Sequence, residues 1–123
     1  MAYKVDWFID QRIIRADLTD EVSINEIALL RDEATKLIED GIPLVHLIID
    51  VSQITKHPNL FELRSVIRNR DPAAGWILIV GANPMIQVVI SIIMQMTNIR
   101  FRLLSGFDAA LDFLQTKDKT VAV

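Results

Sequence analysis

Hydrophobic and polar residues alternate along the first segment of the chain. Every second residue is apolar there: Tyr3, Val5, Trp7 and Ile9. Residues 12–18 form a second β-rich run after the polar pair Asp10-Gln11. Alternation with a period of two is typical of a strand that has one face in the core and one in water. The two runs predict a β-hairpin, followed by a turn at residues 19–22.

A helical pattern follows this hairpin. Ser23 and Glu26 have the spacing of a capping box, in which each side chain satisfies a free N–H group of the first turn. Apolar residues then recur at helical spacing: Ile24, Ile27, Leu30, Ala34, Leu37 and Ile38. Arg31, Asp32, Lys36 and Glu39 are expected around the outside. Gly41 and Pro43 predict the end of this helix.

Two later runs, 44–50 and 76–81, are apolar on both faces except at His46. Such runs are typical of strands that helices cover on each side. Residues 60–70 predict a short helix between them, with Asn59 as its cap. His46 is expected to be a core histidine whose ring nitrogens are satisfied.

The last third of the chain predicts two helices around an edge strand. Asn83-Pro84 is a cap followed by a first-turn proline, which opens a helix from Met85 to about Met96. Residues 99–104 alternate, and Ser105 is expected to cap a final helix. Residues 117–123 are expected to form a loose C-terminal tail.

The element order is therefore ββαβαβαβα, which predicts an α/β fold with a single open mixed sheet of about five strands. A chain of 123 residues with 51% hydrophobic content is long enough for one domain, expected at residues 1–116. Without Cys, it cannot form disulfides, zinc–thiolate sites or catalytic thiols. A net charge of −3 argues against nucleic acid as a main partner. Acids within the first ten residues argue against a signal peptide, so a cytoplasmic location is expected.

Several motifs together resemble the STAS domain, the SpoIIAA-like fold of the sporulation anti-anti-sigma factors. Residues 47–54 (LIIDVSQI) are similar to the third strand of the family, which leads into its regulatory loop, and residues 76–81 to the next strand. Residues 101–114 (FRLLSGFDAALDFL) are similar to the closing strand, turn and helix of divergent STAS-like members. The resemblance covers nearly the whole chain. It implies a non-enzymatic regulatory module that binds another protein.

The chain departs from this family in its regulatory loop. Phosphorylatable members carry Asp-Ser-Ser-Gly where the second helix begins, whereas this chain has Thr55-Lys-His-Pro-Asn-Leu-Phe61. Asn59 keeps the capping role but cannot accept phosphate, so no kinase switch is expected at this position. The resemblance places the recognition surface on this loop and the second helix: Ser52, Thr55, His57, Asn59, Leu60, Arg64 and Arg68.

Catalytic and anion-binding interpretations remain as alternatives. Asp50 ends a predicted strand and His57 follows in the loop, so the two side chains could act as a base and its orienting group. No nucleophile elbow or phosphate-binding glycine motif accompanies them, and we expect no catalytic residue, metal site or cofactor. Arg64 and Arg68 could hold a phosphate or an acidic segment, although a solvated helix face is the favoured explanation. Arg100 and Arg102 are expected on an edge strand, where cations deter aggregation.

The stretch from Pro72 to Ile99 contains no charged residue. In the helix predicted at 85–96, only Gln87, Ser91 and Gln95 are polar, and they form one narrow stripe. A helix that lies on a sheet needs an apolar arc of only slightly more than 100°. The apolar arc of this helix is much wider than that. The additional apolar surface predicts a hydrophobic interface or ligand surface at Met85, Val88, Val89, Ile92, Ile93 and Met96.

This apolar surface could be buried by any of four partners: a neighbouring helix of the chain, a second copy of the chain, a lipid-like ligand or a membrane. A transmembrane span is disfavoured because Gly81 and Pro84 would lie mid-bilayer. Self-association as a homodimer is the preferred explanation, and a pocket for a small hydrophobic ligand is the alternative.

Overall fold

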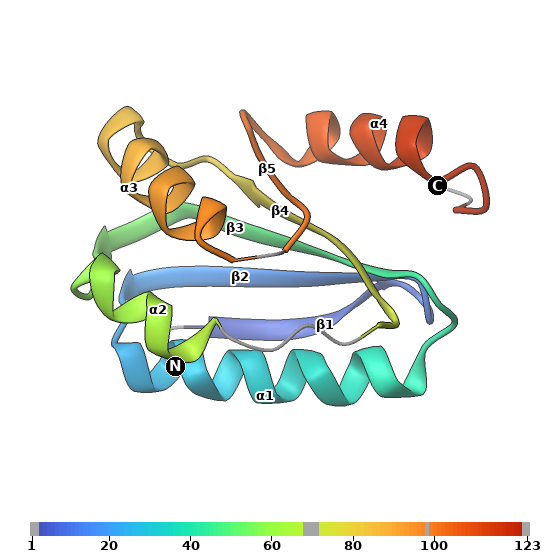
Figure 1. Cartoon of the computed structure of the whole chain (residues 1–123), viewed down its shortest axis with the longest axis horizontal. Coiled ribbons are helices and arrows are strands. Elements are labelled where there is room, and N and C mark those ends of the chain that lie inside the picture. The colour runs from blue at the N-terminus through green and yellow to red at the C-terminus, as the bar shows by residue number, and fades with distance from the viewer. Residues whose placement is uncertain (1–2, 68–71, 98, 122–123) are drawn as a thin grey trace.

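The computed structural model describes residues 3–67, 72–97 and 99–121, and its elements follow the predicted order (Figure 1). The strands are β1 (Tyr3–Ile9), β2 (Ile13–Glu21), β3 (Val45–Lys56), β4 (Ala74–Val80) and β5 (Phe101–Leu104). The helices are α1 (Ile24–Asp40), the 3₁₀ helix η1 (Leu60–Glu62), α2 (Leu63–Val66), α3 (Pro84–Gln95) and α4 (Phe107–Lys117). The predicted α/β fold with one mixed five-stranded sheet is confirmed for the described residues.

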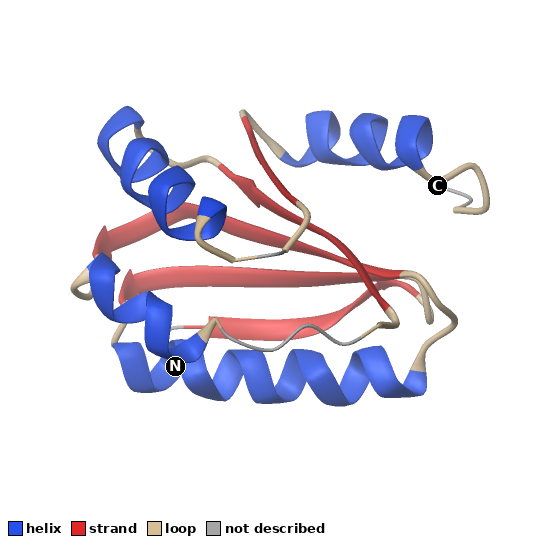
Figure 2. Ribbon diagram, viewed as in Figure 1, coloured by secondary structure: helices blue, strands red, loops and turns tan. Residues whose placement is uncertain are grey.

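The strands lie in the sheet in the same order as in the chain, β1-β2-β3-β4-β5. β1 and β2 form the predicted antiparallel hairpin, and the remaining neighbours are parallel. Crossovers between parallel strands are right-handed, and here they all advance in one direction. As a result, α1, α2 and α3 pack on one face of the sheet, while α4 packs on the other (Figure 2).

The predicted helix starts are confirmed at Ser23 and Asn83. Ser23 Oγ accepts from the backbone N–H of Glu26, and the Glu26 carboxylate accepts from the backbone N–H of Ser23, both at 3.2 Å. Asn83 Oδ1 accepts from the backbone N–H of Ile86 at 2.9 Å, with Pro84 in the first turn. The cap predicted at Ser105 is wrong, because Gly106 occupies that position and offers no side chain.

Three predicted boundaries differ from the structure. β2 continues through residues 19–21, which were expected to turn, and β3 continues to Lys56 beyond the predicted end at Asp50. These extensions pair with each other, from Thr19 opposite Gln53 to Glu21 opposite Lys56. The helix expected at 60–70 is instead a single turn of 3₁₀ helix followed by the four residues of α2. Residues 68–70 of that prediction lie outside the described residues.

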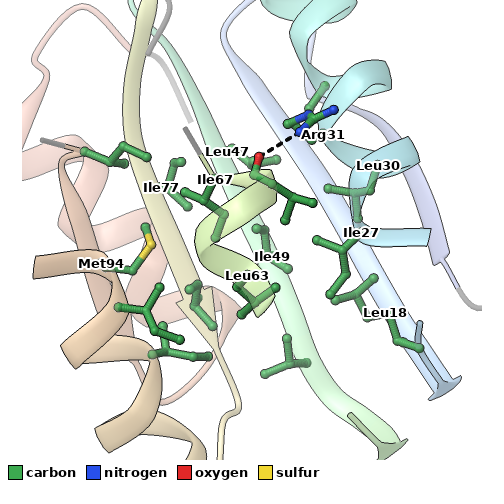
Figure 3. Close-up of a pocket in the computed structure, with 18 of the residues that line it drawn as sticks. Leu18, Ile27, Leu30, Arg31, Leu47, Ile49, Leu63, Ile67, Ile77 and Met94 are labelled. Carbon is green, nitrogen blue, oxygen red and sulfur yellow. Dashed lines mark hydrogen bonds between the residues drawn. The ribbon is translucent and has the colours of Figure 1, made fainter. Parts of the chain in front are cut away.

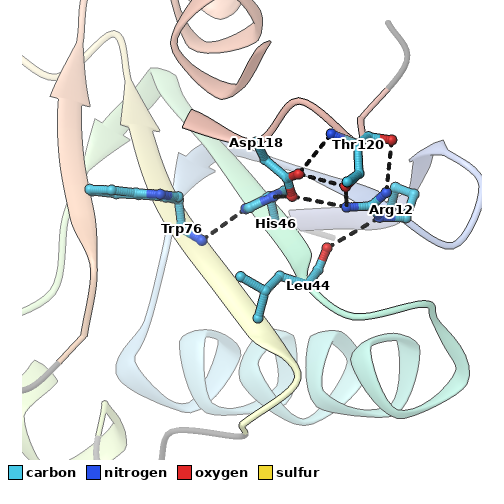
Figure 4. A network of polar contacts seen from close by, with 6 residues as sticks. All are labelled: Arg12, Leu44, His46, Trp76, Asp118 and Thr120. Atoms are coloured by element: carbon cyan, nitrogen blue, oxygen red, sulfur yellow. Dashed lines mark hydrogen bonds and ion pairs between the residues drawn. The ribbon is translucent and has the colours of Figure 1, made fainter. Parts of the chain in front are cut away.

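A buried polar network joins the turn between β1 and β2, strands β3 and β4, and the segment after α4 (Figure 4). His46 is fully buried, and its Nδ1 accepts from the backbone N–H of Trp76 at 2.9 Å. The ring proton is therefore on Nε2, which donates to Asp118 Oδ2 at 2.9 Å. Arg12 Nη2 pairs with the same oxygen at 2.9 Å, and Arg12 Nη1 donates to the carbonyl of Thr120. The prediction of a satisfied core histidine is confirmed.

This network corrects the prediction of a loose tail. Asp118 is bound by Arg12 and His46, and Val121 is buried against the α4 face of the sheet. Residues 118–121 are therefore part of the packed domain. No local pattern indicates this packing, because only the fold brings Arg12 close to a residue 106 positions later.

Candidate functional site

An apolar cavity lies on the three-helix face of the sheet (Figure 3). Its volume is about 200 Å³. Its floor is the middle of the sheet, and its walls are the inner sides of α1, α2 and α3. Most of the side chains that line it are aliphatic, including those labelled in Figure 3: Leu18, Ile27, Leu30, Leu47, Ile49, Leu63, Ile67, Ile77 and Met94.

The cavity follows from the shortness of α2. α1 has 17 residues and α3 has 12, but α2, between them, has only four. A four-residue helix is about 6 Å long, so it cannot cover the whole of the middle strand. Leu47 and Ile49 of β3 therefore line the cavity.

α2 closes one end of the cavity as a wedge between its two longer neighbours. Leu63 and Val66 are buried against Ile24 and Ile27 of α1 and against the inner side of α3. Leu63, Val66 and Ile67 also line the cavity itself. Movement of α2 would therefore widen the cavity.

One side-chain hydrogen bond fixes the end of this wedge. Arg31 Nη1 on α1 donates to the backbone carbonyl of Val66 at 2.9 Å (Figure 3). Its Nε and Nη2 donate to Asp32 Oδ1 at 3.2 and 3.1 Å. The carbonyls in the last turn of a helix have no partner within the helix, so Arg31 caps α2. Arg31 is also the only charged residue among the described residues that line the cavity.

The helical pattern predicts Arg31 on the outer face of its helix and does not indicate this role. The available signal was its spacing, since it lies four residues after Ile27 and three before Ala34. Those intervals put it on the border of the buried stripe, where a long side chain can reach a neighbouring element.

α3 has two apolar sides, as its composition indicated. Its inner side lines the cavity with Ile86, Ile90, Ile93 and Met94. Its outer side carries an exposed apolar stripe, defined as Met85, Val88, Ile92 and Met96, with exposed fractions of 62, 60, 50 and 60%. Two residues of the predicted surface do not belong to this stripe. Ile93 is 1% exposed and is a core residue, and Val89 is half-buried against α2.

The residues predicted for the interaction loop are distributed over several elements. Ser52 and Thr55 lie in β3 rather than in a loop. The hydroxyl of Ser52 donates to Asp50 Oδ1 at 2.6 Å. Asn59 Oδ1 accepts from the backbone N–H of Phe61 at 3.1 Å, so the predicted cap is confirmed at η1.

The rest of this predicted surface lies around α2. His57 lines the cavity, and its Nδ1 is 2.7 Å from the carbonyl of Pro58. Arg64 is exposed and borders a shallow groove between α1 and α2. Arg68 and the side chain of Leu60 lie outside the described residues, so the proposed Arg64–Arg68 pair is not described.

The alternative pairing of Asp50 with His57 does not form. Residues 51–56 separate them as extended strand, which spans roughly 20 Å. Asp50 instead lies 3.7 Å from Arg15 Nη2, whereas His57 faces the cavity. The hypothesis of an acid–base dyad is therefore wrong for these two residues.

Other candidate chemistries have little structural basis in the described part of the chain. No group of three or more His, Asp or Glu residues is placed there to hold a metal ion. Arg102 lies over the ring of Phe113, 5.5 Å from its centroid, so it is partly engaged by α4. None of the described helices has both the length and the apolar content that a bilayer crossing needs.

Comparison with known proteins identifies the fold. The structure of the anti-sigma factor antagonist SpoIIAA in its unphosphorylated form superimposes with a TM-score of 0.60 at 12% identity, covering 99% of this chain and 100% of that one. An uncharacterized protein of the DUF3478 family with a SpoIIAA-like fold, from Shewanella loihica PV-4, gives a TM-score of 0.57 at 14% identity, with 92% of each chain covered. Neither a protein-family model nor a curated protein matches the sequence. The predicted STAS, or SpoIIAA-like, fold is confirmed.

Proposed function

We propose that this chain is a non-enzymatic regulatory module of the STAS type, which works by binding another protein. The observation that carries the proposal is the exposed apolar stripe of α3. Its four members are each at least half exposed, and no charged residue lies on the helix around them. A contiguous apolar surface of this kind is typical of interaction sites.

The binding surface extends from this stripe to η1 and α2. η1 contacts α3 directly, and Phe61 on η1 is 62% exposed. Exposed aromatic side chains often become the anchors of protein interfaces. His57, Asn59 and Arg64 would supply the polar rim. The fold supports a protein partner, because SpoIIAA, which has the same fold, is an anti-sigma factor antagonist.

Asn59 supports regulation by something other than phosphorylation at the usual position. Its amide oxygen already caps η1, and an amide cannot accept a phosphoryl group. A cytoplasmic location and a protein partner rather than nucleic acid fit the acidic composition of the chain.

Site-specific photo-crosslinking in the source cells tests the proposal. A benzophenone amino acid at Ile92 is compared with one at Leu29 on α1, an apolar position with a similar exposed fraction (54%). We expect a crosslinked partner at position 92 that is absent at position 29. With the purified pair, Val88→Asp or Ile92→Asp should weaken binding at least about tenfold, and Leu29→Asp less than about twofold.

The same experiment separates the possible occupants of the stripe. Crosslinks to a second copy of this chain, with a light-scattering mass that rises with concentration, would show that the stripe binds a second copy. The proposed binding to a different protein would then be wrong. Equal crosslinking at positions 92 and 29 would contradict a defined docking surface.

A second candidate function, carrying or sensing a small hydrophobic ligand, is favoured by the cavity. An apolar space of this size can take up a small apolar molecule. This candidate does not exclude the first, since α2 borders both the cavity and the proposed binding surface.

A further inference from the structure

The dimensions of the cavity limit the size of any ligand. An apolar cavity of about 150 Å³ in another protein accommodates benzene. A volume of about 200 Å³ therefore suits a molecule of roughly eight or nine non-hydrogen atoms. A full-length lipid chain would not fit without movement of α2.

The charges at the cavity wall limit the chemistry of the ligand. Arg31 is the only charged residue among the described lining residues, and Asp32 already neutralises it through two hydrogen bonds. A carboxylate ligand next to Arg31 would also lie next to the Asp32 carboxylate, and like charges at short range repel. The current partner of Nη1 is an uncharged carbonyl oxygen, that of Val66.

From these observations we infer that the cavity binds an uncharged, mainly apolar molecule with one hydrogen-bond acceptor oxygen, such as a small ketone or ester. The ligand oxygen takes the place of the Val66 carbonyl on Arg31 Nη1. α2 then loses its side-chain cap, because Arg31 Nη1 no longer donates to the Val66 carbonyl. Occupancy of the cavity thereby loosens α2 and alters the surface that it shares with η1 and α3. This last step rests on the proposed protein-binding function, and ligand binding itself deepens the second candidate function.

Three probes of the same shape test the ligand class: ethylbenzene, acetophenone and benzoate. Their binding is measured by calorimetry and by shifts of backbone amide signals in two-dimensional NMR spectra. We expect acetophenone and ethylbenzene to shift the amides of Leu47, Ile49 and Ile77, which line the floor of the cavity, and benzoate to leave them unchanged.

Two variants on α1 test the role of Arg31. Arg31→Met should weaken acetophenone binding about tenfold, the effect of losing one hydrogen bond to a charged group. It should change ethylbenzene binding less than twofold. Asp32→Asn should create measurable benzoate binding, because it leaves the Arg31 charge uncompensated. Equal effects of Arg31→Met on both neutral probes would overturn the assignment of Arg31.

A variant that fills the cavity is the control for location. Ala34 lines the cavity, and Ala34→Leu should abolish binding of every probe. If that chain does not fold by circular dichroism, Ile90→Phe serves the same purpose. Undiminished binding in a folded filled variant would overturn the site.

Hydrogen exchange tests the coupling to α2. Acetophenone at saturation should speed exchange of the Ile67 amide, which donates to Leu63 in α2, at least about fivefold, with no change at Ile38 in α1. Unchanged exchange at Ile67 would overturn the coupling. If no probe binds but Ile92→Asp still abolishes partner binding, the ligand inference fails and the proposed function stands. If the probes bind but Ile92→Asp leaves partner binding unchanged, the proposed function fails and ligand binding stands.

Discussion

His46 and Asp118, 72 residues apart in the chain, are joined by a hydrogen bond of 2.9 Å between Nε2 and Oδ2 (Figure 4). The ring is fully buried, and the Asp118 side chain is 15% exposed. Arg12, in the turn between β1 and β2, binds the same carboxylate, so Asp118 holds three parts of the chain together.

Asp118→Ala is expected to destabilise the fold by about 3 kcal/mol. The substitution leaves His46 Nε2 buried without an acceptor and Arg12 without its carboxylate, and breaking such a buried pair is costly. Urea denaturation followed by circular dichroism measures the change. The matched control is Asp112→Ala on the exposed side of α4, expected within about 0.5 kcal/mol. Equal losses in both variants would contradict a structural role for the network.

Stability is expected to fall as the pH is lowered from 7.5 to 5.5. Burial lowers the pKa of His46 below its usual value, and the hydrogen bond with Asp118 only partly opposes this. Below about pH 6.5 the unfolded chain takes up a proton that the folded chain does not, so unfolding is favoured, by about 1 kcal/mol over this range. Denaturation curves at several pH values measure it. His57→Gln should keep this dependence, and a flat profile in that variant would contradict the assignment to His46.

A second loss of stability is expected between about pH 4 and pH 2. Burial alone would raise the pKa of Asp118, but hydrogen bonds from Thr120 and His46 outweigh it and lower the pKa to about 2. The folded carboxylate therefore stabilises the protein above the pKa of the unfolded chain, and this contribution is lost as the pH falls through the folded pKa. It amounts to at most about 2 kcal/mol, less solvent screening. Thr120→Val should reduce the loss, which is measurable by acid titration of the circular dichroism signal.

Gly75→Ala is expected to cost about 2 kcal/mol or more. A Cβ at this position would overlap the imidazole of His46, which cannot move away because both of its nitrogens are hydrogen-bonded. Gly106→Ala is the control, since a Cβ there meets no atom within 4 Å, and its expected effect is under about 1 kcal/mol. Thermal denaturation of the two variants makes the comparison.

Ile92 and Ile93 are adjacent in α3 but face opposite environments. Ile93→Ala should destabilise the fold by about 3 kcal/mol, because it opens a void among buried residues. Ile92→Ala should change stability by less than about 0.5 kcal/mol. Chemical denaturation checks both values. A large loss at Ile92 would mean that the stripe is covered within the folded chain.

Incubation with a serine kinase that phosphorylates STAS proteins is expected to leave the chain unmodified by intact mass. The capping position carries Asn59 instead of a hydroxyl. Asn59→Ser is the matched variant, because serine can cap the same turn and also offers a hydroxyl. Phosphorylation of the original chain at Ser52 or Thr55 would contradict the proposed mode of regulation.

Local signals made much of this fold predictable. The alternation of residues 3–9 identified β1 with its observed bounds, and the caps at Ser23 and Asn83 located two helix starts. The extension of β3 was missed because residues 51–56 are largely polar and pair there only with β2, so no buried face marks them as strand.

The candidate site was only half predictable. The composition of α3 shows that it has more apolar surface than packing on the sheet requires. From this the sequence indicated both the stripe and a pocket beneath the helix. The cavity depends on α2 being four residues long, and its polar group depends on Arg31 reaching Val66, 35 residues later. Such relationships arise from tertiary packing, which local periodicity does not encode.

Because the strands follow one another across the sheet in chain order, each strand finds its neighbour already synthesised when it leaves the ribosome. The sheet can therefore grow by addition at a single edge during translation. Asp118 is the exception, since Arg12 and His46 have no carboxylate to bind until α4 and the residue after it have been made. A nascent chain stalled within α4 would carry all five strands and still lack the bonds that secure its first hairpin.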